Sequence, residues 1–248
     1  MKRVNQNLKT ETNTSPLEII NLLKEYSHDT HIMDMRNYSG PLGALYQKDF
    51  TEFRLWAPSA SQVELILFDG YYGRPKESIK MTRSGDSKYY SHKIYGDHHG
   101  LTYRYRLTFI DSTVTESVDP YSKAVTVNGQ RSVVVDLDKT NPEGWGKRMA
   151  PFPSASEAVI YEMHVRDFTG SRNSGMLQRG EFLGVAEEGT VNPNGSATGI
   201  DYLKELGVTH VELLPIFDFQ TVDETNEKPK QYNWGYDPQN FNANGQGG

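Results

Sequence analysis

The sequence FRLWAPSASQVELIL, residues 53–67, decides how most of this chain folds. Its two halves largely alternate apolar and polar side chains with a period of two, which is typical of strands buried on one face. Pro58 and Ser59 stand between the halves and favour a turn. Further short runs of strand-forming residues, separated by turn-forming residues, occupy 89–94, 103–107 and 132–137. This spacing predicts an all-β, immunoglobulin-like antiparallel sandwich over residues 39–149.

The composition limits what the chain can do. It has 248 residues, whereas a complete (β/α)₈ barrel alone needs about 250, so a sandwich and an intact barrel cannot both be present. Cysteine is absent, which excludes disulfides, thiolate metal sites and cysteine nucleophiles. The formal net charge of −6 argues against nucleic acid or an anionic membrane as a partner.

The first 38 residues form a polar lead to the sandwich. Ser15-Pro16-Leu17-Glu18 has the order of a helix capping box with proline at the first helical position, and it predicts a short helix over 16–26. The positive charges at the N-terminus are not followed by an apolar segment, so no signal peptide is recognised. No apolar run is long enough to cross a bilayer. The expected compartment is therefore the cytoplasm.

The pattern changes after residue 150. Residues 158–168 and 208–216 are apolar and predict two strands. Between them, Ile200, Leu203 and Leu206 share one face of a short helix that Gly207 can end. A strand, a helix and a second strand in this order are typical of a parallel α/β sheet. No further strand is expected after residue 216.

The residues most suggestive of ligand binding are YNWGYDP, 232–238. Three aromatic rings could stack on a flat apolar face, with Asn233 and Asp237 as hydrogen-bond partners. Sugar rings combine such C–H faces with hydroxyl edges. A compact loop that buries its own aromatic side chains against the rest of the protein explains the same residues equally well.

Other candidate groups give no clear catalytic pattern. A glycosidase needs two carboxyl groups across one bond, one ionised and one protonated. The sequence brings no two of its candidates together, so a structural role is the favoured interpretation for each of Glu162, Asp167, Glu212, Asp218 and Asp237. His164 and His210 match no metal-binding spacing, and we expect them to be core or second-layer histidines.

Several motifs resemble known families. Residues 53–60, FRLWAPSA, and 119–124, DPYSKA, are similar to a carbohydrate-binding module of family 48. Residues 159–168, VIYEMHVRDF, and 207–215, GVTHVELLP, resemble the first two barrel strands of glycoside hydrolase family 13, the α-amylase superfamily. The heptapeptide YNWGYDP is similar to the hallmark of type I pullulanases. The resemblance runs in order from about residue 40 to 241.

The resemblance implies a retaining hydrolase of α-1,6-glucosidic linkages in pullulan, glycogen and limit dextrins, with an α-glucan as its partner. It implies that the catalytic nucleophile, acid and stabilising carboxylate lie on later strands, so none is expected in this chain and the chain alone should be inactive. Tyr236 matches the residue that stacks on the sugar before the cleaved bond. Asp237, Asn233 and Trp234 belong to the same motif and are expected to bind substrate. No cofactor and no metal site are expected, and the sequence leaves the binding of calcium open.

The expected organisation is a lead over 1–38, a sandwich over 39–149, and the truncated start of a (β/α)₈ TIM barrel over 150–248. Residues 244–248, NGQGG, depart from the family pattern and are expected to mark a truncation. Two alternatives stay open. One is a non-catalytic α-glucan-binding polypeptide, and the other is a different branch-point enzyme of the superfamily, an isoamylase or a branching enzyme.

Overall fold

The computed structural model describes residues 38, 40–84, 89–147, 149–223, 225 and 232–244, the last of these in its backbone only. The predicted helix over 16–26 lies outside the described residues. No helix within the described part of the chain is long and apolar enough to cross a bilayer.

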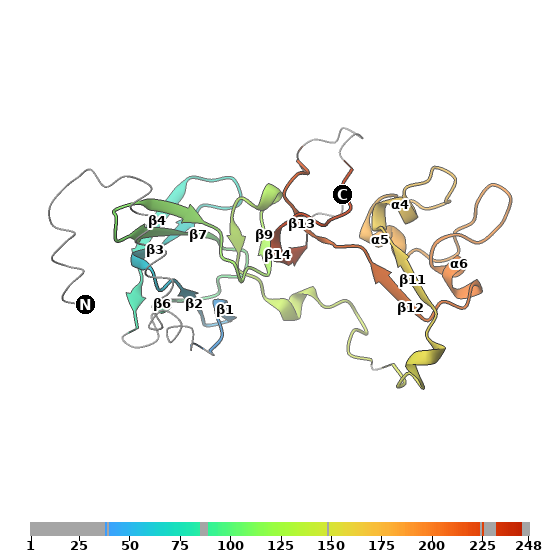
Figure 1. The fold of residues 1–248 in the computed structure, drawn as a ribbon, viewed down its shortest axis with the longest axis horizontal. Coiled ribbons are helices and arrows are strands. Elements are labelled where there is room, and N and C mark those ends of the chain that lie inside the picture. The colour runs from blue at the N-terminus through green and yellow to red at the C-terminus, as the bar shows by residue number, and fades with distance from the viewer. Residues whose placement is uncertain are drawn as a thin grey trace, which may run out of the picture.

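The first sheet of the sandwich is antiparallel throughout and has the strand order β1-β2-β6-β5 (Figure 1). Its strands are β1 (Gly43–Gln47), β2 (Phe50–Trp56), β6 (Tyr89–Tyr95) and β5 (Thr82–Arg83). Side chains of β2 alternate between buried and half-buried along the whole strand, as the period of two predicts.

The second sheet has the order β4-β3-β7-β10-β9, and β8 pairs with β7. Its strands are β3 (Ala60–Phe68), β4 (Pro75–Lys80), β7 (Thr102–Phe109), β8 (Val114–Ser117), β9 (Ala124–Val125) and β10 (Ser132–Val133). Two short 3₁₀ helices, η1 (Val127–Gly129) and η2 (Leu137–Thr140), flank β10. The run predicted over 132–137 therefore ends earlier, because the chain turns into η2 at Leu137.

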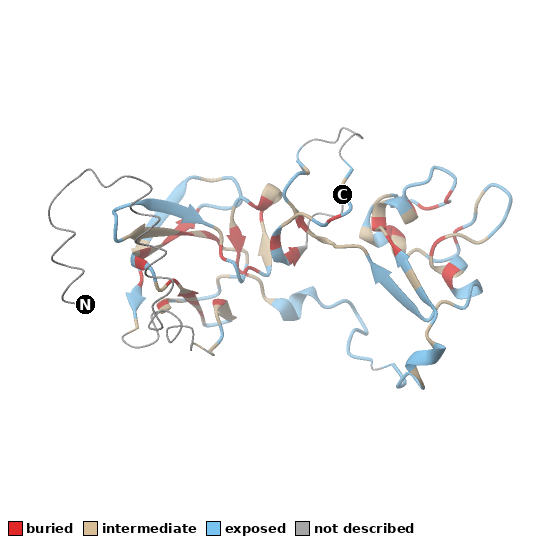
Figure 2. Cartoon of the chain, viewed as in Figure 1, coloured by how far each residue is buried: buried red, intermediate tan, exposed pale blue. Residues whose placement is uncertain are grey.

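The core lies between the two sheets (Figure 2). Phe53 of β2 contacts Tyr103 of β7 edge to face, with ring centroids 4.9 Å apart, and both side chains are fully buried. Leu65 of β3 pairs in register with Tyr105, and both are also fully buried. Each such side chain contributes roughly 1.5–3 kcal/mol relative to exposure. The predicted all-β sandwich is confirmed.

A buried carboxylate, that of Asp119, bonds two tyrosines of β7. Asp119 accepts hydrogen bonds from the hydroxyls of Tyr103 (2.7 Å) and Tyr105 (3.2 Å) and from the backbone N–H of Tyr121 (2.8 Å). Burial raises the pKa of Asp119 despite these donors, and it raises the pKa of Tyr103 and of Tyr105 well above 10. The two tyrosines can be buried because their hydroxyls have this partner.

The second half of the described chain contains a parallel strand pair. Its elements are η3 (Ala155–Glu157), β11 (Ile160–Met163), α4 (Val165–Thr169), α5 (Phe182–Val185), α6 (Gly199–Glu205) and β12 (His210–Leu213). β11 and β12 are parallel, with Ile160 opposite His210. The helix α6 and the left-handed Gly207 after it (φ 74°) agree with the sequence prediction.

The strand predicted over 158–168 is wrong in its second half, where α4 forms instead. The His164 side chain accepts a hydrogen bond from the backbone N–H of Asp167 and so caps the helix. At the other end, the Thr169 hydroxyl donates to the Val165 carbonyl over 2.8 Å. These local side-chain bonds decide the conformation of a stretch whose apolar content is compatible with either state.

The expectation of no strand after residue 216 is also wrong. β13 (Phe217–Phe219) pairs antiparallel with β14 (Pro238–Asn244). The sequence of β14, PQNFNAN, has low strand propensity, so tertiary contacts decide its conformation. In space, β14 lies beside β9 of the sandwich and β13 contacts η1 (Figure 1). The strands β13 and β14 are thus packed on the sandwich.

Candidate functional site

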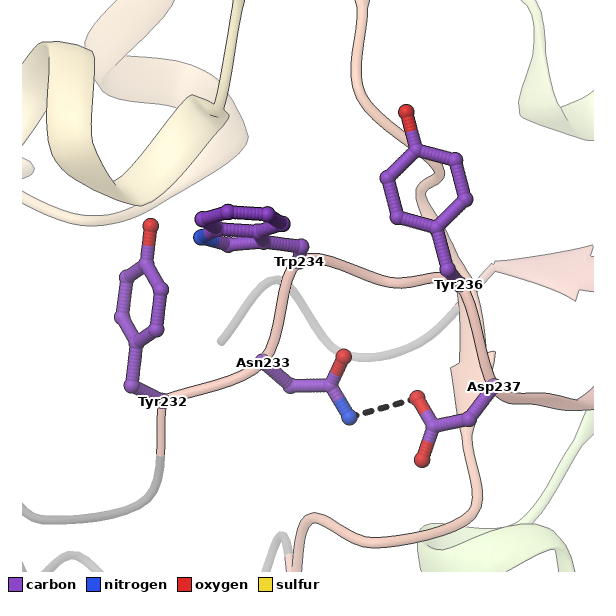
Figure 3. Close-up of a pocket in the computed structure, with 5 residues that line it drawn as sticks. All are labelled: Tyr232, Asn233, Trp234, Tyr236 and Asp237. Carbon is purple, nitrogen blue, oxygen red and sulfur yellow. Dashed lines mark hydrogen bonds between the residues drawn. The ribbon is translucent and has the colours of Figure 1, made fainter.

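An open pocket of about 520 Å³ lies at the predicted heptapeptide, and the described residues that line it all belong to that motif: Tyr232, Asn233, Trp234, Tyr236 and Asp237. The three aromatic rings project to one side of the loop, whereas the Asn233 and Asp237 side chains meet on the other (Figure 3). The rings of Tyr232, Trp234 and Tyr236 are 54%, 61% and 67% exposed. In this chain the loop therefore does not bury its own aromatic side chains.

A hydrogen-bonded triangle holds the base of the loop. The Asn233 amide nitrogen donates to Asp237 Oδ1 (2.5 Å) and to Thr221 Oγ1 (2.7 Å), and the Thr221 hydroxyl donates to Asp237 Oδ2 (2.6 Å). Asn233 Oδ1 accepts from the backbone N–H of Gly235 over 2.6 Å. Every polar atom of the Asn233 side chain is therefore used, so its position is fixed.

Gly235 sits where no larger residue fits. Its φ is +89°, a conformation that side chains disfavour, and it is buried. A Cβ at this position would lie 2.2 Å from the Pro215 carbonyl oxygen and 2.9 Å from a ring carbon of Phe219. The glycine thus lets the loop pack closely on the segment that enters β13.

The same triangle sets the charge of the pocket. The Thr221 hydroxyl, together with the Asn233 amide, holds the pKa of Asp237 below its usual range. The Asp237 carboxyl is therefore ionised at neutral pH, and both of its oxygens accept hydrogen bonds from the protein. A carboxylate in this state is not a general acid.

The start of α4 holds the other side of the loop. A backbone N–H can only donate, so His164 Nδ1 accepts from Asp167 N (3.3 Å) and Nε2 carries the proton that it donates to the Asn233 carbonyl oxygen (3.0 Å). The Tyr232 hydroxyl donates to Asp167 Oδ2, and this hydrogen bond is the largest cause of the raised pKa of Tyr232. His164 is therefore a loop anchor at a helix cap and not a core residue of a strand.

The other candidate residues lie away from this pocket. Glu162 of β11 and Glu212 of β12 are register partners, which the sequence did not predict, and both are exposed. Asp218 is buried and accepts a hydrogen bond from Asn240 Nδ2 over 2.6 Å. His210 is exposed and contacts the Phe152 ring edge to face, so the expectation of a core position is wrong for it.

The described residues contain no group of three or more metal-ligating side chains. Sequence reasoning missed Thr221 and the anchoring roles of His164 and Asp167. Thr221 lies 16 residues from Asp237, and His164 lies 69 residues from Asn233, so no local pattern connects these pairs. The only available signal was Gly235, whose place inside an aromatic motif indicates a backbone constraint.

Comparison with known proteins agrees with the fold and with the motif. Residues 41–122 match the family model described as carbohydrate-binding module 48 (isoamylase N-terminal domain). Pullulanase of Bacillus subtilis is 44% identical over 207 residues, which cover 83% of this chain and 28% of that protein. Isoamylase SU1 of Zea mays is 29% identical over 231 residues, covering 81% of this chain and 27% of that protein.

A crystal structure of pullulanase from Paenibacillus barengoltzii in complex with maltohexaose and α-cyclodextrin superposes with a TM-score of 0.83 at 44% identity. The match covers 88% of this chain and 34% of that one. The chain thus carries a family 48 carbohydrate-binding module as its sandwich. Over most of its length it is a homologue of the pullulanases, and it spans about a third or less of the relatives described here.

Proposed function

We propose that this chain provides the α-glucan-recognition part of a pullulanase-type debranching hydrolase, which cleaves α-1,6-glucosidic linkages by a retaining mechanism. The identity to the Bacillus subtilis pullulanase (44%) exceeds that to the maize isoamylase (29%), which favours pullulan, glycogen and limit dextrins as the substrate class over other branch-point chemistry. Within the chain, residues 39–149 are the sandwich module. Residues 150–216, with their parallel β11 and β12 joined through α6, are the opening of a (β/α)₈ barrel.

The observation that carries the proposal is the aromatic side of the loop at 232–238. Trp234 and Tyr236 are exposed although their backbone is held by buried and polar contacts beneath them. Exposure of large rings on a fixed support gives a platform that needs no reorganisation before a sugar stacks on it. The neutral C–H face of a glucose unit matches the rings, and its hydroxyls match the phenol oxygens. The ionised Asp237 organises the loop from below.

The same geometry supports binding rather than bond cleavage at this pocket. Retaining hydrolysis requires two carboxyl groups about 5–5.5 Å apart, one of them protonated. Among the described residues that line the pocket, Asp237 is the single carboxylate, and its lowered pKa keeps it ionised. The chain by itself is therefore expected to release no reducing sugar from pullulan. A purely glucan-binding polypeptide remains the second candidate, and this lone carboxylate is the observation that favours it.

The test is titration of maltohexaose into the 248-residue chain, followed by the side-chain N–H resonance of Trp234 in NMR spectra. Stacking on an aromatic ring contributes roughly 0.5–1.5 kcal/mol, so Tyr236→Ala should weaken binding about 2- to 13-fold. Tyr95→Ala is the matched control, because Tyr95 is 80% exposed on β6 of the sandwich and lies outside the pocket. Equal affinities of the two variants, or no response of Trp234 to the sugar, would contradict the proposal.

A further inference from the structure

The turn that contains η1 is the part of the sandwich on which the β13–β14 hairpin packs. Thr126 braces this turn from both ends, because its carbonyl accepts from Gly129 N (2.9 Å) and its hydroxyl accepts from Arg131 N (3.1 Å). Thr126 N in turn donates to the Arg131 carbonyl over 2.9 Å. Asn128 and Gly129 are both left-handed, with φ of 57° and 61°. A turn held in this way cannot shift easily to relieve a collision.

Gly129 meets the hairpin directly. A Cβ added there would lie 2.6 Å from Asn240 Nδ2 and 2.6 Å from Asp218 Oδ2, well inside any normal contact. Asp218 and Asn240 are register partners of β13 and β14 and are hydrogen-bonded to each other. Both side chains are buried. The absence of a side chain at Gly129 is thus what lets this polar pair sit against the turn.

Two further hydrogen bonds join the hairpin to the sandwich on either side of that contact. Asn128 Nδ2 donates to Asp223 Oδ1 over 2.9 Å, just beyond the end of β13. Asn242 Nδ2, on β14, donates to the Pro120 carbonyl oxygen over 3.2 Å. The hairpin is therefore fixed along its length and not only at one point.

The aromatic loop belongs to the connection between the two strands of the hairpin. Phe219 pairs with Pro238, and Gln220 N donates to the Asp237 carbonyl over 3.0 Å. The next residue, Thr221, supplies the hydroxyl that bonds Asp237 and Asn233. A displacement of β13 and β14 at Gly129 is therefore transmitted through a few residues to the base of the pocket.

We propose that Gly129 is a positioning residue for the aromatic loop, so that the sandwich module sets the geometry of the 232–238 pocket through the β13–β14 hairpin. The consequence for sugar affinity rests on the proposed function, whereas the mechanical coupling does not. In this assignment, the turn at 126–131 of the module holds the glucan site in place.

The test compares Gly129→Ala with Gly100→Ala in the whole chain. Gly100 is also left-handed (φ 84°) but has no atom within 4 Å of an added Cβ, so its substitution gives the same backbone strain without the collision. Hydrogen–deuterium exchange should be at least about fivefold faster over 217–223 and 232–243 in Gly129→Ala than in Gly100→Ala, with β7 equally protected in both. The Trp234 side-chain N–H resonance should shift only in Gly129→Ala.

If Gly129→Ala does not fold, Asn242→Ala is the second variant. It removes the hydrogen bond to the Pro120 carbonyl at an exposed position, and it should speed hydrogen–deuterium exchange over 217–223 and 232–243. Unchanged exchange in the hairpin and loop of the folded variant would overturn the positioning role. A different result would contradict the proposed function: no change of the Trp234 side-chain N–H resonance when maltohexaose is added to the unmodified chain. If the positioning role and the proposed function both hold, Gly129→Ala weakens maltohexaose binding and Gly100→Ala does not.

Discussion

Substitution of the buried Asp119 by asparagine should change how the stability of the sandwich depends on pH. Burial raises the pKa of Asp119 in the folded state above the value of about 3.9 that it has in the unfolded chain. The folded state then binds a proton more tightly than the unfolded state does. The free energy of unfolding must therefore fall as the pH rises from about 4 through the raised folded pKa, by roughly 1.4 kcal/mol for each pKa unit of the difference.

The Asp119→Asn variant loses this term, because an amide does not titrate in this range. It also loses an acceptor. Asp119 Oδ2 accepts from both tyrosine hydroxyls and Oδ1 accepts from Tyr121 N, so an asparagine must turn its NH₂ group towards one of these donors. An unsatisfied buried group costs about 1–3 kcal/mol. Near pH 4 the free energy of unfolding of the variant should be lower than that of the unmodified chain by about 1–3 kcal/mol. This difference in the free energy of unfolding should narrow towards pH 7.

Urea denaturation followed by circular dichroism at several pH values between 4 and 7 measures this difference. Asp111→Asn is a control whose effect should stay nearly constant between pH 4 and 7, because hydrogen bonds from Thr113 hold the pKa of the exposed Asp111 below its ordinary value and its carboxyl stays ionised over this range. Its carboxylate stabilises the fold above the unfolded pKa, and that contribution is lost as the pH falls. A destabilisation by Asp119→Asn that stays constant or widens as the pH rises would refute the reasoning.

Two further predictions concern hydroxyl groups at the pocket and in the core. Thr221→Val removes the main hydrogen bond to Asp237, so the pKa of Asp237 should rise towards its ordinary value. An NMR titration of the Asp237 carboxyl carbon measures this pKa. An unchanged pKa would mean that the Thr221 hydroxyl does not set the charge of the pocket. In the core, the folded pKa of Tyr103 lies well above 10, so the unfolded chain loses its phenol proton first and the free energy of unfolding should fall as the pH rises above about 10. Tyr103→Phe should make this alkaline decline shallower in urea denaturation, and an identical decline would contradict the assignment.

Several sandwich strands that the sequence identified have one buried face. Along β2 every second side chain is buried, and the same periodicity is visible in the residue types. β4 and β8 were missed because nearly all of their side chains are exposed, so they carry no alternation of apolar and polar residues. Such edge strands form because the neighbouring strands β3 and β7 offer hydrogen-bonding partners, and this information is not local.

The candidate site, too, could be predicted from the sequence only in part. Composition alone singled out residues 232–238 as a possible stacking platform, because three aromatic residues beside one glycine and one carboxylate are unusual in a loop. Whether those rings face solvent or the core could not be read from the motif, since the two interpretations need the same residues. Exposure is decided by the anchors His164 and Thr221, which fold back from other segments.

By itself, then, the sequence determined the sandwich core, the parallel strand pair with its intervening helix, and the position of the aromatic motif. These features follow from periodicity and turn residues within short windows of the chain. The tertiary structure alone decided the β13–β14 hairpin, whose residues have weak strand propensity and become a strand pair while packed on the turn at Gly129. It also decided the place of the pocket beside that hairpin, because the hydrogen bonds and the close contact involved join residues up to 122 positions apart.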